Sequence, residues 1–455
     1  MSDHLEIAIL AAGIGSRMRS NKAKVLQTLA AKPLLGYLLD AVEQLNPATI
    51  HVVIGQDAEN VKAAFSDLKN INWVHQAKRL GTGHAMQQVY PHLQGKGRVL
   101  VLLGDCPLIQ SETIRGLVGQ EADLSILTVD MDDPFNYGRI IRDGAQILQI
   151  VEEKDANDVQ KRIKEINTGV MAADVSDLGN WLSQLTNDNA QAEYLLTDIV
   201  EHANADGKKV SGWKVEDPFE VTGINTFAQL AGLERALQSK QAEELMLSGV
   251  QVMDPSRLDI RGAVTAGQGV RLDVNVILEG EVTLGDNVDI GPNCLIKDST
   301  IESGVQIRAN SVIEEATVGP GAIIGPFARL RPGAELAAEV HIGNFVEVKK
   351  SYMGRGSKAN HLAYIGDATI GEGVNYGAGA ITCNYDGANK HQTVIEDDAF
   401  IGTNVSLVAP VTVGTGATVG AGSTVSKDVG ANELAVARGK QVAIKNWNRP
   451  GKDKK

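Results

Sequence analysis

Residues 284–291 read LGDNVDIG, and this pairing of an aliphatic residue with glycine returns at intervals of six, or multiples of six, through the second half of the chain. In a parallel β-helix, one aliphatic residue of each hexad points inward and three hexads close one triangular coil. A single coil cannot bury its own apolar face, so the repeat predicts a stack of coils. The pairs are Leu284-Gly285, Ile290-Gly291, Val318-Gly319, Ile324-Gly325, Ile342-Gly343, Ile401-Gly402, Val413-Gly414 and Val419-Gly420.

Irregularities in the repeat indicate where binding segments lie. One-residue slips, as between Ile296 and Ile301, need only a small adjustment at a corner. The spacing across 348–370 is three hexads plus four residues, and that across 382–395 is two hexads plus one. We expect both segments to leave the coils as loops on the binding face. The polar candidates in or beside them are Lys349, Lys350, His361, Tyr364, Asn384 and Tyr385.

The first half of the chain lacks this repeat and alternates short apolar runs with polar, helix-like stretches. Such alternation is typical of an α/β domain with a mostly parallel sheet. The apolar runs are residues 7–10, 50–54, 99–103 and 124–129.

Between the halves, leucines at helical spacing follow Thr226, which forms a capping-box signal with Gln229. We interpret this segment as a helical arm. The chain is therefore predicted to contain an N-terminal domain (1–225), a linker helix (226–248), a β-helix (249–438) and a basic tail (439–455). Most such tails are solvated, although the phosphates of coenzyme A are an available partner for this one.

Composition fits a large protein with two cores. The 455 residues are 43% hydrophobic and only 4% aromatic, and 48 glycines suit a β-helix filled by Val, Ile and Ala. A net charge of −13 argues against binding to nucleic acid. No signal peptide or membrane-spanning run is recognisable. Cys106, Cys294 and Cys383 are odd in number and far apart, which argues against a disulfide framework and favours the cytoplasm.

The first chemical motif is LAAGIGSRM at residues 10–18, with Lys24 a few residues on. Glycines after a strand let the backbone approach phosphates, and Arg17 and Lys24 can meet their charge. Because Met18 stands where a GxGxxG fingerprint needs its third glycine, the spacing alone leaves a plain strand-to-helix turn open. The longer string resembles the signature of the sugar-nucleotidyltransferases, Leu-x-Ala-Gly-x-Gly-Ser/Thr-Arg-Met followed by Pro-Lys. Ala23 departs from that proline.

This resemblance implies a nucleotide-sugar site. Asp105 ends an apolar run, where parallel sheets bind ligands, and its oxygens suit Mg²⁺ beside a triphosphate. Asn225 is implied as the second metal contact and Gln76 as a reader of uracil. Taken alone, Asp105 could equally be a helix cap, and the segment after Gln76 a turn. The implied contacts of UTP and UDP-N-acetylglucosamine are Leu10, Ala11, Ala12, Gly13, Lys24, Gln76, Gly81, Thr82, Gly104, Asp105, Gly138, Glu152, Asn167 and Asn225, with Arg17 and Lys24 as catalytic residues.

The whole chain resembles the family of bacterial bifunctional enzymes that join N-acetylglucosamine-1-phosphate uridylyltransferase to glucosamine-1-phosphate N-acetyltransferase. Membership implies an α/β Rossmann-like nucleotidyltransferase domain followed by a left-handed parallel β-helix of hexapeptide repeats. It also implies a homotrimer with acyl-transfer sites between neighbouring subunits. The most distinctive C-terminal pieces are FARLRP (327–332), GNFVEVK (343–349), NHLAY (360–364), NYGAG (375–379) and NYDG (384–387).

Acetyl transfer from a thioester to a sugar amine needs a base that works near neutral pH, which suits histidine. The resemblance implies that His361 is this base, although a lone histidine is more often plain polar surface. Arg331 and Lys349, which alone could be solvated charges, are implied to hold the sugar phosphate. Tyr364 and Asn375 would complete the amino-sugar site. The implied acetyl-CoA contacts are Ala378, Asn384, Tyr385, Thr403 (usually serine in the family), Ala421 and Arg438.

The predicted function is a two-step synthesis of UDP-N-acetylglucosamine in the cytoplasm, from glucosamine-1-phosphate, acetyl-CoA and UTP with Mg²⁺. No nucleic-acid or membrane partner is expected. One alternative is a nucleotidyltransferase of the glucose-1-phosphate type whose β-helix serves only assembly or allostery, and the His361 segment opposes it. The other is a scaffold protein with the same two domains but without catalysis, which the intact Arg17, Lys24, Asp105 and Asn225 oppose.

Overall fold

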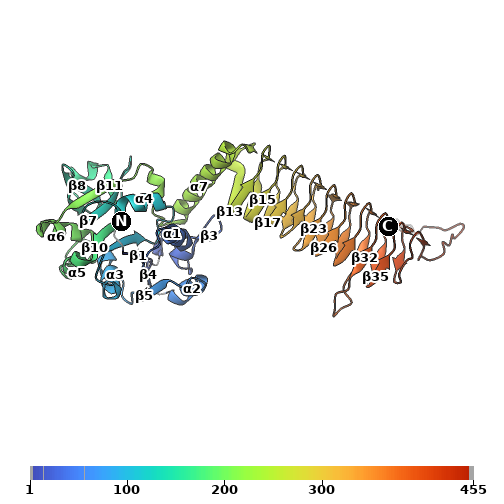
Figure 1. Cartoon of the computed structure of the whole chain (residues 1–455), viewed down its shortest axis with the longest axis horizontal. Helices are drawn as coiled ribbons and strands as arrows, with labels where there is room; N and C mark the ends of the chain where they lie inside the picture. The colour runs from blue at the N-terminus through green and yellow to red at the C-terminus, as the bar shows by residue number, and fades with distance from the viewer. Residues whose placement is uncertain (1–3, 14, 56, 450–455) are drawn as a thin grey trace, which may run out of the picture. The chain divides into compact units, whose positions relative to one another are not determined.

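The computed structural model describes residues 4–13, 15–55 and 57–449, and the chain divides into two compact units, Met1–Glu234 and Arg235–Lys455. The division falls inside helix α7 (Phe227–Leu247), at the position where the sequence predicts a linker helix (Figure 1). The described part of the basic tail, residues 439–449, is exposed and contains no helix or strand; residues 450–455 lie outside the described residues.

The first unit is built on a mixed sheet with the strand order β5-β4-β1-β6-β10-β7-β11-β9-β8. Strands β5 to β6 in this order are parallel, whereas β10 runs antiparallel to both of its neighbours. The predicted apolar runs are confirmed as strands within a residue or two. The strands are β1 (Leu5–Leu10), β4 (Thr49–Ile54), β5 (Ile71–His75), β6 (Arg98–Leu103), β7 (Leu124–Asp130), β8 (Arg139–Asp143), β9 (Gln146–Val151), β10 (Glu165–Asp174) and β11 (Val210–Lys214), with a separate pair β2 (Thr28–Leu29) and β3 (Lys32–Pro33).

Helices cover both faces of this sheet, which explains why its central strands are mostly apolar on both faces. Ile7 and Ile9 of β1 pack with α1 and α4, and Ala8 packs with α3 and α5 on the other face. The helices are α1 (Leu34–Glu43), α2 (Ala58–Ala64), α3 (Thr82–Val89), α4 (Ser111–Val118), α5 (Val175–Ser183) and α6 (Ile199–Ala205), and the short 3₁₀ turns are η1 (Ser16–Met18), η2 (Lys24–Leu26), η3 (Tyr90–His92), η4 (Gln160–Arg162), η5 (Leu196–Asp198) and η6 (Pro218–Val221).

The second unit is the predicted β-helix, drawn in Figure 1 as a stack of coils. Each short strand pairs in parallel with the strand one coil further on, so inward residues form columns. One column contains Ile324, Ile342, Ala359 and Tyr376, all buried. The hexapeptide prediction is therefore confirmed: local periodicity dictates which side chain points inward, and stacking buries it.

The elements of this unit are η7 (Pro255–Arg257), β12 (Gln251–Val252), β13 (Leu258–Ala266), β14 (Arg271–Leu272), β15 (Val276–Leu284), β16 (Asp289–Ile290), β17 (Leu295–Ile301), β18 (Gln306–Ile307), β19 (Val312–Glu314), β20 (Thr317–Val318), β21 (Ile323–Ile324), β22 (Arg329–Leu330), β23 (Ala334–Leu336), β24 (His341–Asn344), β25 (Glu347–Lys349), β26 (Ser351–Met353), β27 (Lys358–His361), β28 (Tyr364–Gly366), β29 (Ala368–Ile370), β30 (Asn375–Tyr376), β31 (Ile381–Cys383), β32 (Thr393–Ile395), β33 (Phe400–Ile401), β34 (Ser406–Val408), β35 (Val411–Val413), β36 (Thr418–Val419), β37 (Thr424–Val425) and β38 (Leu434–Ala435).

The prediction that residues 348–370 leave the coils as a loop is wrong. Met353, Ala359 and Ile365 are buried, so this segment is an ordinary coil. Two of its inward steps are five residues long instead of six, and each short step contains a left-handed residue: Lys350 (φ 45°) in one and Asp367 (φ 49°) in the other. His361 therefore ends strand β27 on a rigid coil and does not lie in a loop.

The one-residue slips are also five-residue steps, and they contain Asp298 (φ 44°) and Glu315 (φ 46°). In all four short steps the left-handed residue follows the inward residue by two positions, whereas in a six-residue step such as that of Leu362 it follows by three. The second predicted loop is confirmed. Residues between β31 and β32 leave the coils and project outward near β32 (Figure 1), with an antiparallel bridge between Tyr385 and Lys390. Across the residues that the structure describes, no helix combines the length and the hydropathy of a bilayer span.

Candidate functional sites

The turn after β1 is shaped around Lys24. Gly15 adopts a left-handed φ of 64°, and a Cβ atom there would approach the Cβ of Lys24 to 3.1 Å. Glycine therefore lets the lysine stem lie directly against the turn. Lys24 begins η2 and is only 8% exposed. Within this motif, Ile14 lies outside the described residues.

The Lys24 ammonium joins the two predicted metal ligands. Its Nζ donates to Asp105 Oδ2 at 2.5 Å and to Asn225 Oδ1 at 2.9 Å. Asp105 follows β6 and Asn225 precedes α7, and the Ile224 amide donates to the Asp105 carbonyl at 3.0 Å, which ties the two segments together. Two oxygens thus converge on one cation, and a carboxylate with an amide oxygen is a donor set that fits Mg²⁺.

The start of α7 leaves the Asn225 side chain available for this role. Thr226 Oγ1 accepts from the Gln229 amide at 3.1 Å, as predicted for the helix cap. Gln229 Oε1 in turn accepts from the backbone amide of Asn225 at 2.8 Å. The capping interactions therefore fix the Asn225 backbone without using its side chain.

One face of the Lys24–Asp105 pair opens into a cavity of about 280 Å³. Gln76 is buried in its wall, where Nε2 donates to the Gly81 carbonyl at 3.2 Å and contacts His84 Nδ1 at 3.0 Å. Because a carbonyl can only accept, this contact fixes which end of the Gln76 amide faces Gly81. The lining includes Leu10, Ala11, Ala12, Gly13, Lys24, Gln76, Arg79, Gly81, Thr82, Gly104, Asp105 and Glu193.

A second cavity of about 290 Å³ shares Thr82 and Asp105 with the first. It contains Arg17, Gly138, Glu152, Asn167 and Asn225. All the residues predicted for the nucleotide-sugar site therefore line these two adjoining cavities. The sequence did not point to Arg79 and Glu193, which carry no motif of their own.

Glu152 and its neighbour Glu153 have different surroundings. Glu152 faces the second cavity, where burial raises the pKa of its carboxyl despite a weak contact from Thr197 Oγ1 at 3.4 Å. Glu153 instead accepts from Arg139 Nη2 at 2.6 Å, and that arginine side chain is 2% exposed. The first carboxylate is available to a ligand, whereas the second neutralises a buried guanidinium.

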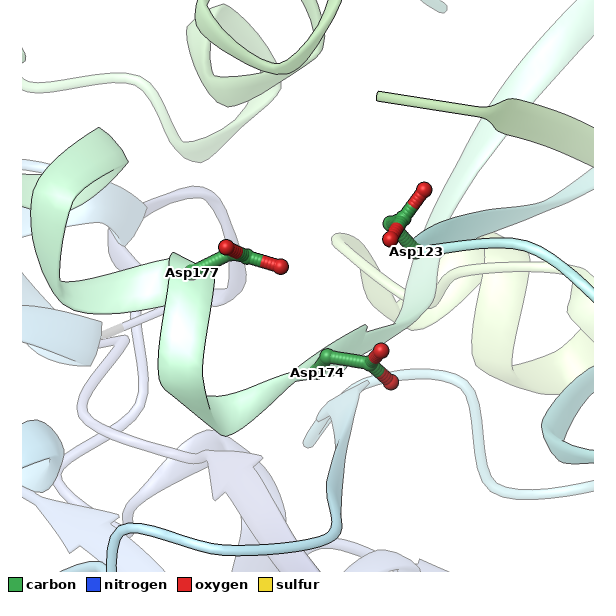
Figure 2. A group of neighbouring side chains, drawn as sticks. All are labelled: Asp123, Asp174 and Asp177. Atoms are coloured by element: carbon green, nitrogen blue, oxygen red, sulfur yellow. The ribbon is translucent and has the colours of Figure 1, made fainter. Parts of the chain in front are cut away.

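A separate group of three carboxylates, Asp123, Asp174 and Asp177, is shown in Figure 2. Lys208 Nζ lies 2.8 Å from Asp177 Oδ2 and 3.6 Å from Asp123 Oδ1, and Arg98 Nε lies 3.5 Å from Asp174 Oδ1. Arg98 begins β6, whereas the predicted metal residue Asp105 follows the other end of that strand. These carboxylates therefore already contact two cations, and they lie at the end of β6 opposite to Asp105.

On the β-helix, His361 heads a column of residues at one corner. The carbonyls of His361, Ala378 and Thr403 each accept a hydrogen bond from a backbone amide of the next coil, at 3.2, 2.8 and 2.8 Å. These bonds stack Ala378, Thr403 and Ala421 in order beyond His361, one coil apart. A cavity of about 350 Å³ runs along the column and also includes Asn375. Three of the predicted acetyl-CoA contacts thus extend in a line from the predicted base.

Asn344 lies one coil before His361, in register with it. Its Oδ1 is 2.8 Å from His361 Nδ1. An acceptor at Nδ1 leaves Nε2 as the basic nitrogen of a neutral ring. Asn344 lies in the segment 343–349 but has no predicted role, since only the coil length of 17 residues relates it to His361.

The predicted phosphate ligands occupy a different face. Arg331 and Lys349 belong to neighbouring coils in register, and Arg331 Nη1 donates to Glu347 Oε1 at 2.8 Å. Tyr364 follows on the next coil, in register with Glu347. The cavity that contains His361 does not include Arg331, Lys349 or Tyr364. The residues predicted for acetyl transfer therefore do not all line this cavity.

The projecting loop brings a further cation to this face. Lys349 lies close enough to Lys390 to lower the pKa of the Lys390 ammonium. Asp367 opposes part of this repulsion, and two lysines held at one face favour a bound anion. Lys390 was not predicted, because nothing in the sequence indicates where an extruded loop folds back.

The remaining predicted cofactor contacts are placed as follows. Asn384 Nδ2 donates to Asp367 Oδ2 at 2.6 Å, and Tyr385 is exposed with its hydroxyl donating to the Gly387 carbonyl at 2.6 Å. Arg438 Nη1 donates to the Ala421 carbonyl at 2.7 Å, next to the His361 column. Asn384 and Tyr385 do not line the His361 cavity.

Comparison with known proteins agrees with two transferase units. Residues 7–163 match the MobA-like NTP transferase domain, 260–353 the GMPPB C-terminal domain, and 392–427 six repeats of the bacterial transferase hexapeptide. The fold and its two sites define a bifunctional transferase, with a nucleotidyltransferase half and a hexapeptide-repeat half. The chain is 54% identical over 451 residues to the bifunctional protein GlmU of Marinobacter nauticus, covering 98% of this chain and 99% of that protein. The chain therefore belongs to the GlmU family.

This result confirms the predicted family and the predicted bifunctional transferase. Among solved structures, a putative glucose-1-phosphate thymidylyltransferase from Bacillus anthracis in complex with a sucrose shows 19% identity and a TM-score of 0.42. The match covers 51% of this chain and 94% of that one. A likeness this low does not bear on the assignment.

Proposed function

We propose that the chain makes UDP-N-acetylglucosamine in two steps. The β-helix transfers an acetyl group from acetyl-CoA to glucosamine-1-phosphate, and the N-terminal unit then couples the product to UTP with release of pyrophosphate. The observation that carries this proposal is the convergence of Lys24, Asp105 and Asn225 where a base-sized cavity meets a second, polar one.

In the uridylyl step, the sugar phosphate attacks the α-phosphorus of UTP. Gln76 reads the uracil in the first cavity, while Gly138, Glu152 and Asn167 hold the sugar in the second. Arg17 and Lys24 neutralise charge on the phosphates, and the held position of the Lys24 ammonium favours the transition state. Asp105 and Asn225 would hold Mg²⁺, which supplies further screening of the triphosphate charge. The nucleophile is already anionic, so no general base is needed.

In the acetyl step, His361 accepts the proton of the sugar amine through Nε2 as the nitrogen attacks the thioester carbonyl. The C–S bond then breaks, and the departing coenzyme A thiolate takes that proton and leaves as the thiol. Asn344 holds the ring at Nδ1. The backbone amide of Ala378, one coil beyond His361, would face the tetrahedral oxyanion. Asn375 lines the same cavity and orients the amino sugar.

Because the residues predicted for acetyl transfer do not line one cavity, we propose that the enzyme is a homotrimer. Arg331, Lys349 and Tyr364 do not reach the cavity that contains His361, so a neighbouring copy would supply them or the cofactor contacts Asn384 and Tyr385. Three copies would close a ring about a three-fold axis through repeated heterologous contacts between their solenoids. We place the enzyme in the cytoplasm, where UTP and acetyl-CoA occur, and its product would feed peptidoglycan and lipopolysaccharide.

The test is an assay of each half-reaction on the purified chain. Glucosamine-1-phosphate with acetyl-CoA should release coenzyme A thiol, and N-acetylglucosamine-1-phosphate with UTP and Mg²⁺ should release pyrophosphate. Pyrophosphate release without any thiol release would instead support a nucleotidyltransferase whose β-helix serves assembly. If neither thiol nor pyrophosphate is released, the alternative of a scaffold protein without catalysis would be supported.

A further inference from the structure

The backbone at Ala23, immediately before Lys24, has a φ of −52° and a ψ of 141°. This φ lies within the range that a proline ring imposes. Alanine has no such constraint, but it keeps a backbone N–H. That N–H donates to Asp57 Oδ2 at 3.0 Å, across 34 residues of sequence.

The hydrogen bond that Asp57 accepts is the long-range backbone tie on this turn, whose other backbone bonds are local. The Leu26 amide donates to the Ala23 carbonyl and the Gln27 amide to the Lys24 carbonyl, both at 3.0 Å. Those bonds fix the shape of η2 but do not attach it to the sheet. Asp57, which follows β4 and precedes α2, provides such an attachment.

Asp57 is itself held in place. Its Oδ1 accepts from Asn60 Nδ2 at 2.6 Å, and its carbonyl accepts from the Val61 amide at 3.2 Å. Although Asp57 occupies the N-cap position of α2, its side chain makes no capping hydrogen bond. Its Oδ2 atom therefore accepts from the Ala23 amide and makes no capping hydrogen bond to α2.

We propose that Asp57 is a positioning residue for Lys24. By holding the Ala23 amide, Asp57 keeps the turn in the one backbone conformation that carries the Lys24 ammonium to Asp105 and Asn225. Asp57 replaces, through a charge-assisted hydrogen bond, the restraint that proline would apply covalently at position 23. The inference rests on the proposed role of Lys24 in uridylyl transfer.

The two restraints are mutually exclusive, which makes the inference testable. A proline ring at position 23 would occupy the space of the N–H that now meets Asp57 Oδ2. Ala23→Pro alone should therefore push the Asp57 carboxylate aside and slow uridylyl transfer. In an Asp57→Ala background, the same proline meets no carboxylate and restores the φ restraint.

The experiment measures kcat and KM for uridylyl transfer, acetyl transfer, and thermal unfolding on the full-length chain. We expect Asp57→Ala to lower uridylyl kcat/KM by about 10-fold, the loss typical of one hydrogen bond to a charged group. Asp57→Asn, which keeps an acceptor oxygen, should lose less than about 3-fold. Glu59→Ala, which removes an exposed carboxylate from the same helix, is the matched control and should equal the parent. The double variant Ala23→Pro/Asp57→Ala should recover to within about 3-fold of the parent. Acetyl transfer should be unchanged throughout.

Two results would overturn the inference: Asp57→Ala with parental uridylyl activity, or an Asp57→Ala defect that Ala23→Pro fails to repair. Lys24→Ala separates this failure from that of the proposed function. If Lys24→Ala retains uridylyl activity, the role of Lys24 itself is wrong. If Lys24→Ala is inactive while Asp57→Ala is normal, only the positioning role fails.

Discussion

The adjacent carboxylates Glu152 and Glu153 should respond oppositely to the same substitution. Glu153→Gln removes the anionic partner of Arg139, whose side chain is 2% exposed. Breaking a buried pair costs about 3–5 kcal/mol, because a buried charge is left unpaired. We take about 3 kcal/mol, since the Tyr137 and Lys161 carbonyls still accept from this guanidinium. For a unit of about 230 residues, that loss lowers the first melting transition by about 6–12 °C.

Glu152→Gln should leave that transition unchanged or raise it. Burial raises the pKa of Glu152, so the folded unit disfavours the carboxylate at pH 8, and a neutral amide removes that penalty. The difference from the parent should vanish at a pH below the ordinary glutamate pKa. Uridylyl transfer should instead fall by about 10- to 100-fold, the loss of one hydrogen bond between a charged group and substrate.

The assay compares thermal unfolding with pyrophosphate release for both variants. Equal losses of stability in the two variants would refute the structural distinction. A Glu153→Gln variant that melts normally but loses activity would show that the substrate carboxylate had been assigned to the wrong residue.

Three further predictions concern Asp198, a fragment without the β-helix, and Lys390. Burial raises the pKa of Asp198 to about 6, so the folded state favours the protonated carboxyl. The resulting stability is fully present below the ordinary aspartate pKa and is lost as the pH rises through about 6. Asp198→Asn should therefore raise the melting temperature at about pH 8 but not at about pH 3, and a difference that does not depend on pH would contradict this. A fragment of residues 1–248 should retain uridylyl transfer but lose acetyl transfer and trimer formation, and light scattering that shows a trimeric fragment would contradict the assembly surface. Lys390→Met should raise the KM for glucosamine-1-phosphate by about 10-fold without changing that for acetyl-CoA, with the exposed Lys427→Met as the control. Equal effects of the two variants would remove Lys390 from the phosphate site.

The β-helix could be predicted because its inward positions repeat along the chain. The same reasoning failed at residues 348–370, where the period shortens to five at Lys350 and Asp367. The length of a step depends on where its left-handed residue falls, which residue type does not indicate, so the sequence suggested a loop where the chain forms a coil. His361 nevertheless lies at the edge of a coil cavity, as a binding residue should.

The nucleotide cavities collect the predicted residues because the carboxyl ends of β1 and β6 are neighbours in the sheet, with Leu10 beside Leu103. Contacts that cross between segments without a shared motif could not be predicted. Asn344 meets His361 across one coil, and Asp57 meets Ala23 across the first unit. Such pairs depend on three-dimensional register, which periodicity alone does not specify.

The central claim is that one chain carries two independent transferase sites, and a crossed pair of variants tests it most directly. Both half-reactions should be measured on Asp105→Asn and on His361→Ala. Asp105→Asn should lose Mg²⁺-dependent pyrophosphate release and keep thiol release, because it removes a carboxylate from the proposed metal site. His361→Ala should lose thiol release by about 10²- to 10⁴-fold and keep pyrophosphate release, because it removes the general base. If either variant loses both activities while melting like the parent, or if His361→Ala keeps near-normal thiol release between about pH 6 and pH 9, the account is contradicted.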